Sequence, residues 1–194
     1  AGNKDFYFDI HEKCDGPHGL VAGTTGFGKS ELLKTWILSM CVNYHPHDVS
    51  FVIIDYKGDS LVKPLSPLPH VIGTLTNIEG DITRQLISLQ SEIKRRQEAF
   101  SKLGSKLGCN IDHLDEYQEY YKKGMVDDPI PYLIIVVDEF VELKMERPDF
   151  ISGLIRVSRV GRSLGILLVL ATQKPGGQVD DQMLSNSRFR MCLK

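Results

Sequence analysis

A glycine-rich stretch near the N-terminus has the residue types and the spacing that bind phosphate. Residues 22–31 read AGTTGFGKSE and contain the pattern Gly23-x-x-x-x-Gly28-Lys29-Ser30. Small residues let the backbone wrap closely around phosphate oxygens and direct its N–H groups inward. A lysine at this spacing reaches the β- and γ-phosphates of a nucleotide, and the serine hydroxyl ligates Mg²⁺. The pattern therefore predicts a P-loop for a nucleoside triphosphate.

The residues expected to contact the nucleotide include the loop and the first turn of the following helix. They are Gly23, Thr24, Thr25, Gly26, Phe27, Gly28, Lys29, Ser30 and Glu31. Phe27 is bulky for a loop that must enclose phosphate. Two interpretations stay open for it: the side chain points outward, or it weakens nucleotide binding.

A second acidic site follows about a hundred residues later, where the apolar run 133–137 ends in Asp138 and Glu139. Buried strands rarely end in paired carboxylates that have no function. We predict that Asp138 holds Mg²⁺ beside Ser30. Glu139 is predicted to orient and deprotonate the water that attacks the γ-phosphate. The P-loop upstream disfavours the simpler interpretation, in which the acids only solvate a strand end.

A polar amide, Gln173, follows another apolar run, residues 166–171. The carboxyl ends of parallel strands meet at one edge of a sheet, so Gln173 is predicted to lie between the P-loop and the acidic pair. There it would contact the γ-phosphate as a sensor. A simple role as a turn residue is the alternative.

These residues must be positioned by β–α–β units, because apolar runs bounded by turn residues alternate with helical patterns. Strands are expected at residues 20–22, 49–55, 132–138, 166–171 and 188–193, and helices at about 29–42, 81–100 and 149–163. One strand, 49–55, is expected between the two motifs, which makes the acidic strand the third in sequence. This extra strand and the glutamate beside the metal aspartate favour an α/β fold of the RecA-like (ASCE) P-loop NTPase type. Such a domain has three αβα layers and a mostly parallel central sheet.

The helix expected at 81–100 has an amphipathic pattern. Its apolar stripe contains Ile82, Leu86, Leu89, Ile93 and Phe100, and Arg84, Arg95 and Arg96 occupy other positions. Between residues 101 and 131 the pattern weakens, and we expect a flexible insertion with one short helix.

Composition excludes several classes of protein. The chain has 194 residues, 42% of them apolar, and a net charge of −2, so no global basic field recruits nucleic acid or anionic membrane. No signal peptide is visible, and the longest apolar run is far shorter than the roughly 20 residues of a membrane helix. The four cysteines fit no zinc spacing, which favours reduced, mostly buried thiols and the cytosol as the compartment.

Taken together, the motifs resemble the ATPase domains of the FtsK/SpoIIIE type. The resemblance rests on residues 16–31, 52–58, 93–97, 134–140, 161–165 and 170–175. It implies a lead-in at residues 1–15 and one ATPase domain at 16–194, whose C-terminal part is expected to be truncated. Within this family, residues 68–77, 159–165 and 186–194 are most similar to the type VII (ESX/WXG100) secretion ATPases of the EssC/EccC type.

The resemblance implies an ATP- and Mg²⁺-dependent ATPase domain that couples hydrolysis to protein export. Expected partners are tandem ATPase domains of the same protein or other subunits of a homo-oligomeric ring, expected to be a hexamer, and WXG100-type secreted proteins. The domain is expected to lie in the cytoplasm of a bacterium, with membrane anchoring only through other parts of the parent protein. Two alternatives stay open: a DNA translocase motor, and a docking module that binds nucleotide without turnover.

The family also implies an arginine supplied in trans by a neighbouring domain or subunit. Arg84 is the candidate, from its position in the helix relative to Arg95 and Arg96. The alternatives are Arg96, Arg159, Arg162 and Arg188, and Arg84 as an ordinary exposed residue. Because such an arginine is worth about 10³–10⁵ in rate, the isolated domain is expected to hydrolyse ATP slowly.

Overall fold

The structure is a computed structural model that describes residues 9–11, 13–24, 26–56, 60–76, 83–173 and 187–193. In these residues one sheet has the order β3-β2-β4-β5-β1-β6, and all neighbouring strands are parallel. The strands are β1 (His18–Gly23), β2 (Val49–Asp55), β3 (Val71–Thr76), β4 (Tyr132–Asp138), β5 (Ile166–Thr172) and β6 (Ser187–Leu193). The central strands β1, β2, β4 and β5 are buried over nearly their whole length, as strands covered on both faces must be.

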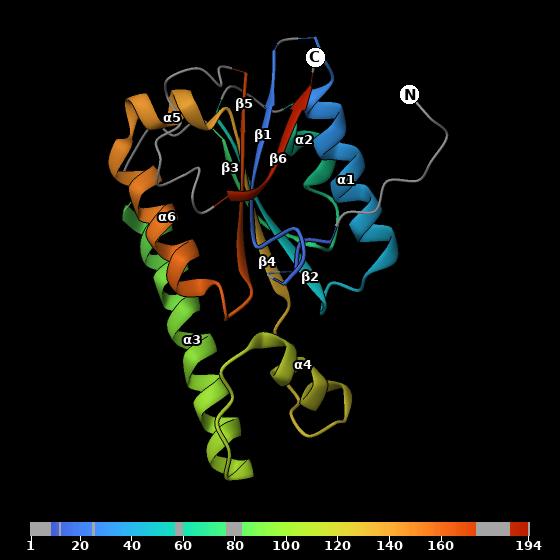
Figure 1. Cartoon of the computed structure of the whole chain (residues 1–194), viewed down its shortest axis with the longest axis vertical. Helices are drawn as coiled ribbons and strands as arrows, with labels where there is room; N and C mark the ends of the chain where they lie inside the picture. Colours follow the sequence, from blue (N-terminus) through green and yellow to red (C-terminus); the bar gives the residue numbers. More distant parts are fainter. Residues whose placement is uncertain are drawn as a thin grey trace.

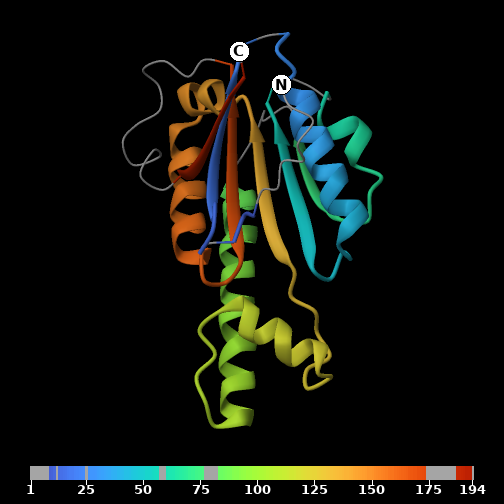
Figure 2. The same ribbon diagram turned by 45° about the vertical axis from the view of Figure 1, so that its right-hand side comes forward.

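Helices cover both faces of the sheet and complete three αβα layers (Figures 1 and 2). One face carries α1 (Lys29–Asn43) and α2 (Val62–Leu65), and the other carries α3 (Thr83–Leu107), α5 (Phe140–Glu146) and α6 (Pro148–Gly161). The short helix α4 (Leu114–Lys122) lies beyond the sheet, beside the C-terminal half of α3. There Tyr117 stacks on Phe100 of α3, with 5.3 Å between the ring centroids.

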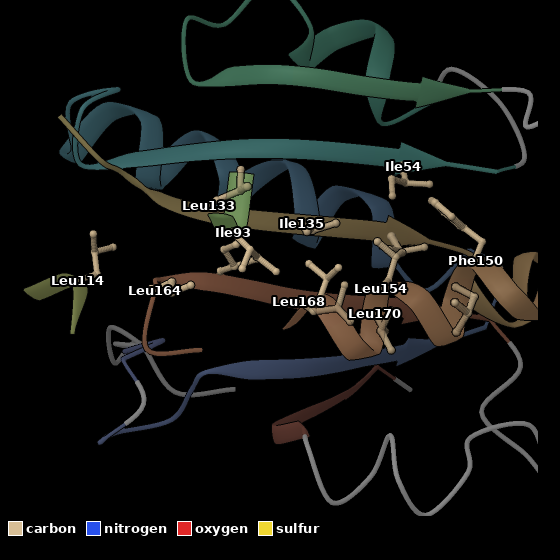
Figure 3. Packing of buried hydrophobic residues seen from close by; sticks show 14 of the residues in the cluster. Ile54, Ile93, Leu114, Leu133, Ile135, Phe150, Leu154, Leu164, Leu168 and Leu170 are labelled. Atoms are coloured by element: carbon tan, nitrogen blue, oxygen red, sulfur yellow. The ribbon is translucent and has the colours of Figure 1, made fainter. Parts of the chain in front are cut away.

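Two apolar clusters fill the spaces between the layers. Successive strand residues point to opposite faces, so the inner strands β1, β2, β4 and β5 contribute to both clusters. The cluster beneath α3, α5 and α6 contains Ile54, Ile93, Leu133, Ile135, Phe150, Leu154, Leu168 and Leu170 (Figure 3). The cluster beneath α1 and α2 contains Leu33, Ile37, Phe51, Ile53, Leu65, Ile134, Val136 and Val169. This packing fixes the sheet and leaves the carboxyl ends of the strands at one edge, the upper edge in Figure 1.

The predicted fold class and the strands and helices expected from the sequence are confirmed, with three corrections. First, β3 was not predicted. Along the chain, two strands therefore lie between the P-loop and the acidic strand, and β4 is the fourth strand rather than the third. Strand β3 lies at the sheet edge, where its residues are only partly buried or exposed, and it contains Gly73. Such a strand has no continuous apolar run to identify it.

The second and third corrections concern helices. The short helices α2 and α5 were not predicted, and α3 continues to Leu107 rather than ending near residue 100. The expected stripe of α3 is confirmed for its described members, because Ile93 and Phe100 are buried and Leu86 and Leu89 pack against the same cluster. The predicted helix start near Asp81, with Ile82, lies outside the described residues, as do residues 1–8 of the expected lead-in.

Two further findings concern the helices and the cysteines. Within the described ranges, none of the helices combines the length and the apolar composition that crossing a membrane requires. The thiols of Cys14, Cys41, Cys109 and Cys192 are all free. The expectation that they are mostly buried is wrong, because Cys14, Cys109 and Cys192 are exposed and Cys41 is half-buried.

Candidate active site

The glycine-rich loop connects the end of β1 to the start of α1, the position that the sequence predicted (Figure 1). Gly26 and Gly28 have φ angles of 86° and 83°, in the left-handed region that glycine adopts without strain. Gly28 is also the N-cap of α1, and no side chain caps this helix end. The amides of the first helical turn, which have no partner within the helix, therefore face the loop and favour an anion there.

Lys29 lies at the start of α1, and its side chain is 4% exposed. Its ammonium donates a hydrogen bond to Asp138 Oδ1 and contacts Glu139 Oε2 at 3.3 Å. Strand β5 lies between β1 and β4 in the sheet, so the lysine reaches across its end to the acidic pair. The P-loop and the acidic residues, separated by more than a hundred positions in sequence, thus form one cluster.

Asp138 and Glu139 are 6% and 2% exposed. Asp138 ends β4, and its Oδ1 accepts a hydrogen bond from the Glu139 backbone N–H at 2.9 Å. Glu139 is the N-cap of α5 with φ 54° and ψ 44°, and among the described non-glycine residues it alone has a positive φ. This left-handed turn between strand and helix is a strained conformation of the kind that concentrates at functional sites.

The end of β5 completes the cluster. Thr172 Oγ1 donates to Glu139 Oε1 at 3.3 Å, and the Gln173 backbone N–H donates to the same oxygen at 3.1 Å. Gln173 therefore lies next to the acidic pair, at the strand end where the sequence predicted it. The contact of Thr172 was not predicted, because a threonine that ends a strand is an ordinary strand residue by type.

The other predicted nucleotide-binding residues differ in their placement. Ser30 is half-buried in the first turn of α1, and Thr24 is exposed. Phe27 is 53% exposed, so its side chain points outward, the first of the two interpretations given above. The carboxylate of Glu31 pairs instead with Lys34 Nζ at 2.8 Å on the exposed surface of α1. Thr25 lies outside the described residues.

The arginine candidates fall into two groups. Arg84 is exposed in the first turn of α3, and Arg159, Arg162 and Arg188 are exposed as well. Arg96 is 1% exposed, and it donates to Glu92 Oε1 at 2.8 Å and to the Leu164 carbonyl at 2.6 Å. A guanidinium held in this way inside its own domain is not available to a neighbour, which argues against Arg96. The sequence pattern did not predict that Arg96 is buried.

The cluster fits a magnesium nucleotide. Counted in their ionised forms, one ammonium faces two carboxylates, and all three side chains are almost fully buried. Buried charges of one sign are costly unless they are compensated, so the cluster favours one more cation. Carboxylate and hydroxyl oxygens, as on Asp138 and Ser30, are the ligands that Mg²⁺ prefers. Asp138 and Ser30 would therefore hold Mg²⁺ here.

The fold and the site together define a class of protein. The parallel sheet is the middle of three αβα layers. Within the sheet, β5 lies between the P-loop strand β1 and the acidic strand β4, and the two motifs meet at one edge. This is a RecA-like P-loop NTPase domain. The chain belongs to the FtsK/SpoIIIE family, whose family model matches residues 2–177.

Relatives within the family are similar over nearly the whole chain. The "ESX secretion system protein EccC" of Geobacillus thermodenitrificans is 52% identical over 189 residues, which are 96% of this chain and 12% of that protein. The "Type VII secretion system protein EssC" of Staphylococcus aureus (strain NCTC 8325 / PS 47) is 49% identical over 187 residues, again 96% and 12%. The chain therefore spans 12% of the length of these relatives.

Solved structures agree with the fold. The cytoplasmic domain of the Thermomonospora curvata type VII secretion ATPase EccC matches with a TM-score of 0.79 and 34% identity, over 92% of this chain and 21% of that chain. A second structure, the T. curvata EccC ATPases 2 and 3 in complex with a signal sequence peptide, matches with a TM-score of 0.82 over 97% of this chain and 32% of that chain. Its sequence is 24% identical, so it supports the fold alone.

Proposed function

We propose that this domain binds and hydrolyses ATP as one ATPase unit of a type VII secretion protein. The observation that carries the proposal is the buried ammonium of Lys29, in contact with both Asp138 and Glu139 beside the P-loop. One ammonium between two carboxylates and a helix N-terminus matches the charge pattern of a triphosphate with its metal ion.

The roles of the residues follow from this arrangement. The backbone of Gly23–Ser30 and the first turn of α1 bind the phosphates, and Lys29 moves from the carboxylates to the β- and γ-phosphates. Ser30 and Asp138 hold Mg²⁺, which neutralises charge that develops on the phosphate oxygens. Phe27 contributes its backbone only, because its side chain points to solvent.

Hydrolysis requires a base and a contact to the γ-phosphate. Glu139 accepts a proton from the attacking water, a role for which it must lie in the water-poor space beside the P-loop. Gln173, whose backbone already contacts Glu139, places its amide near the γ-phosphate. Arg84 is the candidate for the arginine supplied by a neighbouring domain or subunit, because it is exposed. The isolated domain is therefore expected to turn over slowly.

The link to secretion is supported by the names of the relatives, whose sequences are 49–52% identical to this chain. We infer a cytoplasmic domain within a larger, membrane-anchored bacterial protein that contains further ATPase domains and assembles into a ring, expected to be hexameric. Secreted proteins of the WXG100 type are the proposed cargo. Duplex DNA is disfavoured as the cargo, because this chain carries a net charge of −2 rather than a basic field.

Calorimetry with Mg·ATP tests the binding site directly. We expect binding by the wild type and at least a tenfold loss of affinity in Lys29→Ala, since one charge-assisted contact to phosphate is worth about 1.5–3 kcal/mol. Lys102→Ala is the matched control, because Lys102 is exposed on α3. Equal binding by Lys29→Ala and the wild type would contradict the proposal.

Turnover is tested in the full-length parent protein. Glu139→Gln is expected to bind Mg·ATP and to lose roughly 10²–10⁴ in rate, the usual contribution of a general base. Duplex DNA is expected to leave the wild-type rate unchanged, and stimulation by DNA at low salt would favour the DNA translocase instead. A wild type that binds ATP and never hydrolyses it would favour the docking module.

A further inference from the structure

The two carboxylate oxygens of Glu139 have different surroundings. Oε1 accepts from the Thr172 hydroxyl at 3.3 Å and from the Gln173 backbone N–H at 3.1 Å. Among the described residues, Oε2 contacts the ammonium of Lys29, at 3.3 Å. One oxygen is thus held by the end of β5, and the other by a group that phosphate would attract away.

Thr172 is unusual for its strand. Every residue of β5 is buried, and the six that precede Thr172 are apolar. Thr172 is 0% exposed, in a position where valine would have the same shape without the cost of burying a hydroxyl. The hydroxyl offsets that cost by donating to Glu139.

We propose that Thr172 is a positioning residue for Glu139. Together with the backbone N–H of Gln173 it holds Oε1, so that Oε2 is the oxygen that accepts the proton of the attacking water. The inference rests on the proposed ATP hydrolysis and adds a residue that the P-loop and acidic motifs do not contain. When Lys29 moves to the phosphates, Oε2 is released while Oε1 stays in place. Binding of the substrate and exposure of the base are therefore coupled through Lys29.

The positioning role matters because Glu139 begins a helix in a left-handed turn. Its side chain has several rotatable bonds, and the turn alone does not fix the carboxylate. A displacement of about 1 Å in a reacting group can cost about 10²-fold in rate. A second anchor on Oε1 is a direct way to prevent that displacement.

The test is the isosteric substitution Thr172→Val in the full-length parent protein. We expect kcat to fall about 10- to 100-fold, since one of two anchors is lost. The KM for ATP and the affinity for Mg·ATP are expected to stay within about threefold, because Thr172 is not expected to contact phosphate. Thr172→Ser retains the hydroxyl and is expected to restore kcat to within about threefold of the wild type.

A matched control makes the same chemical change elsewhere. Thr74→Val lies on the exposed side of edge strand β3, and we expect it to leave kcat unchanged. A Thr172→Val protein with wild-type kcat overturns the positioning role alone, provided that Glu139→Gln is inactive. Equal losses of kcat and nucleotide affinity that Thr172→Ser fails to rescue also overturn it. A wild type without ATP hydrolysis overturns the proposed function and the positioning role together.

Discussion

The ammonium of Lys29 lies 3.3 Å from Oε2 of Glu139, although the two residues begin different helices on opposite faces of the sheet. The residue proposed to bind phosphate is thus in contact with the residue proposed to activate water. Each is buried, and each depends on the other for charge compensation. Stability and nucleotide binding are therefore expected to be linked at this pair.

Lys29→Met is expected to destabilise the nucleotide-free protein. It leaves Asp138 and Glu139 adjacent, buried and without their ammonium, and breaking a buried ion pair in this way costs about 3–5 kcal/mol. Urea unfolding without nucleotide measures the loss. The double variant Lys29→Met/Asp138→Asn is expected to recover part of it, because one of the two carboxylates is removed. Unchanged unfolding of Lys29→Met would mean that the ion pair does not stabilise the fold.

Much of this site could be predicted from the sequence because its residues belong to short motifs at the ends of buried strands. The pattern from Gly23 to Ser30 places Lys29 at a helix start, and the run before Asp138 places the acids at a strand end. Parallel strands with buried faces then leave few ways to arrange the two. Contact between Lys29 and Asp138 was therefore the expected outcome, and the structure has it.

The missed features share a different physical cause. Strand β3 has no continuous apolar run and helix α5 has only seven residues. The formation of both depends on neighbours: β3 pairs with β2, and α5 follows the left-handed turn at Glu139. The Thr172 hydroxyl and the buried guanidinium of Arg96 depend on which residues lie opposite them in space. The periodicity of apolar residues predicts helices and strands, but it does not predict such tertiary contacts.

Arg96→Met is expected to destabilise the domain without a direct effect on chemistry. Arg96 links α3 to the Leu164 carbonyl just before β5, and the substitution leaves that buried carbonyl unpaired. Loss of a hydrogen bond from a charged group costs about 1.5–3 kcal/mol, measured by chemical unfolding. Arg95→Met is the control: Arg95 is the next residue on the helix and also pairs with Glu92, but its side chain is 50% exposed. A loss below about 1 kcal/mol is expected there.

Arg84→Ala is expected to lower the ATPase rate without lowering the stability of the domain. Arg84 is exposed, so its loss leaves the unfolding free energy within about 0.5 kcal/mol of the wild type. In the assembled parent protein the ATPase rate is expected to fall by about 10³-fold or more, the minimum contribution of an arginine supplied in trans. Lys94→Ala, 78% exposed on the same helix, is expected to change neither quantity. Wild-type turnover by Arg84→Ala would transfer the role to Arg159, Arg162 or Arg188.

His18 makes the stability of the fold depend on pH. Its side chain is 6% exposed in β1, and Nδ1 accepts a hydrogen bond from the Leu168 N–H of β5 at 3.1 Å. Burial, with a smaller contribution from the positive charge of Arg162, lowers the pKa of His18 from 6.5 to about 4. Between these two values the unfolded chain binds a proton that the folded chain does not. The free energy of unfolding therefore falls as the pH is lowered through this range.

The substitution His18→Asn isolates this contribution, because the asparagine oxygen can accept the Leu168 N–H without binding a proton near neutral pH. From pH 7.5 to pH 5, the wild type is expected to lose about 2 kcal/mol more than His18→Asn does in urea unfolding. Above about pH 7.5, roughly one unit over the unfolded-state pKa, the His18 contribution is nearly complete, so the two proteins are expected to show parallel pH dependence there. His45→Asn, on the exposed connection between α1 and β2, controls for the loss of an imidazole. If His18→Asn and the wild type lose the same stability between pH 7.5 and pH 5, then His18 is not held neutral by its burial in β1 beside β5.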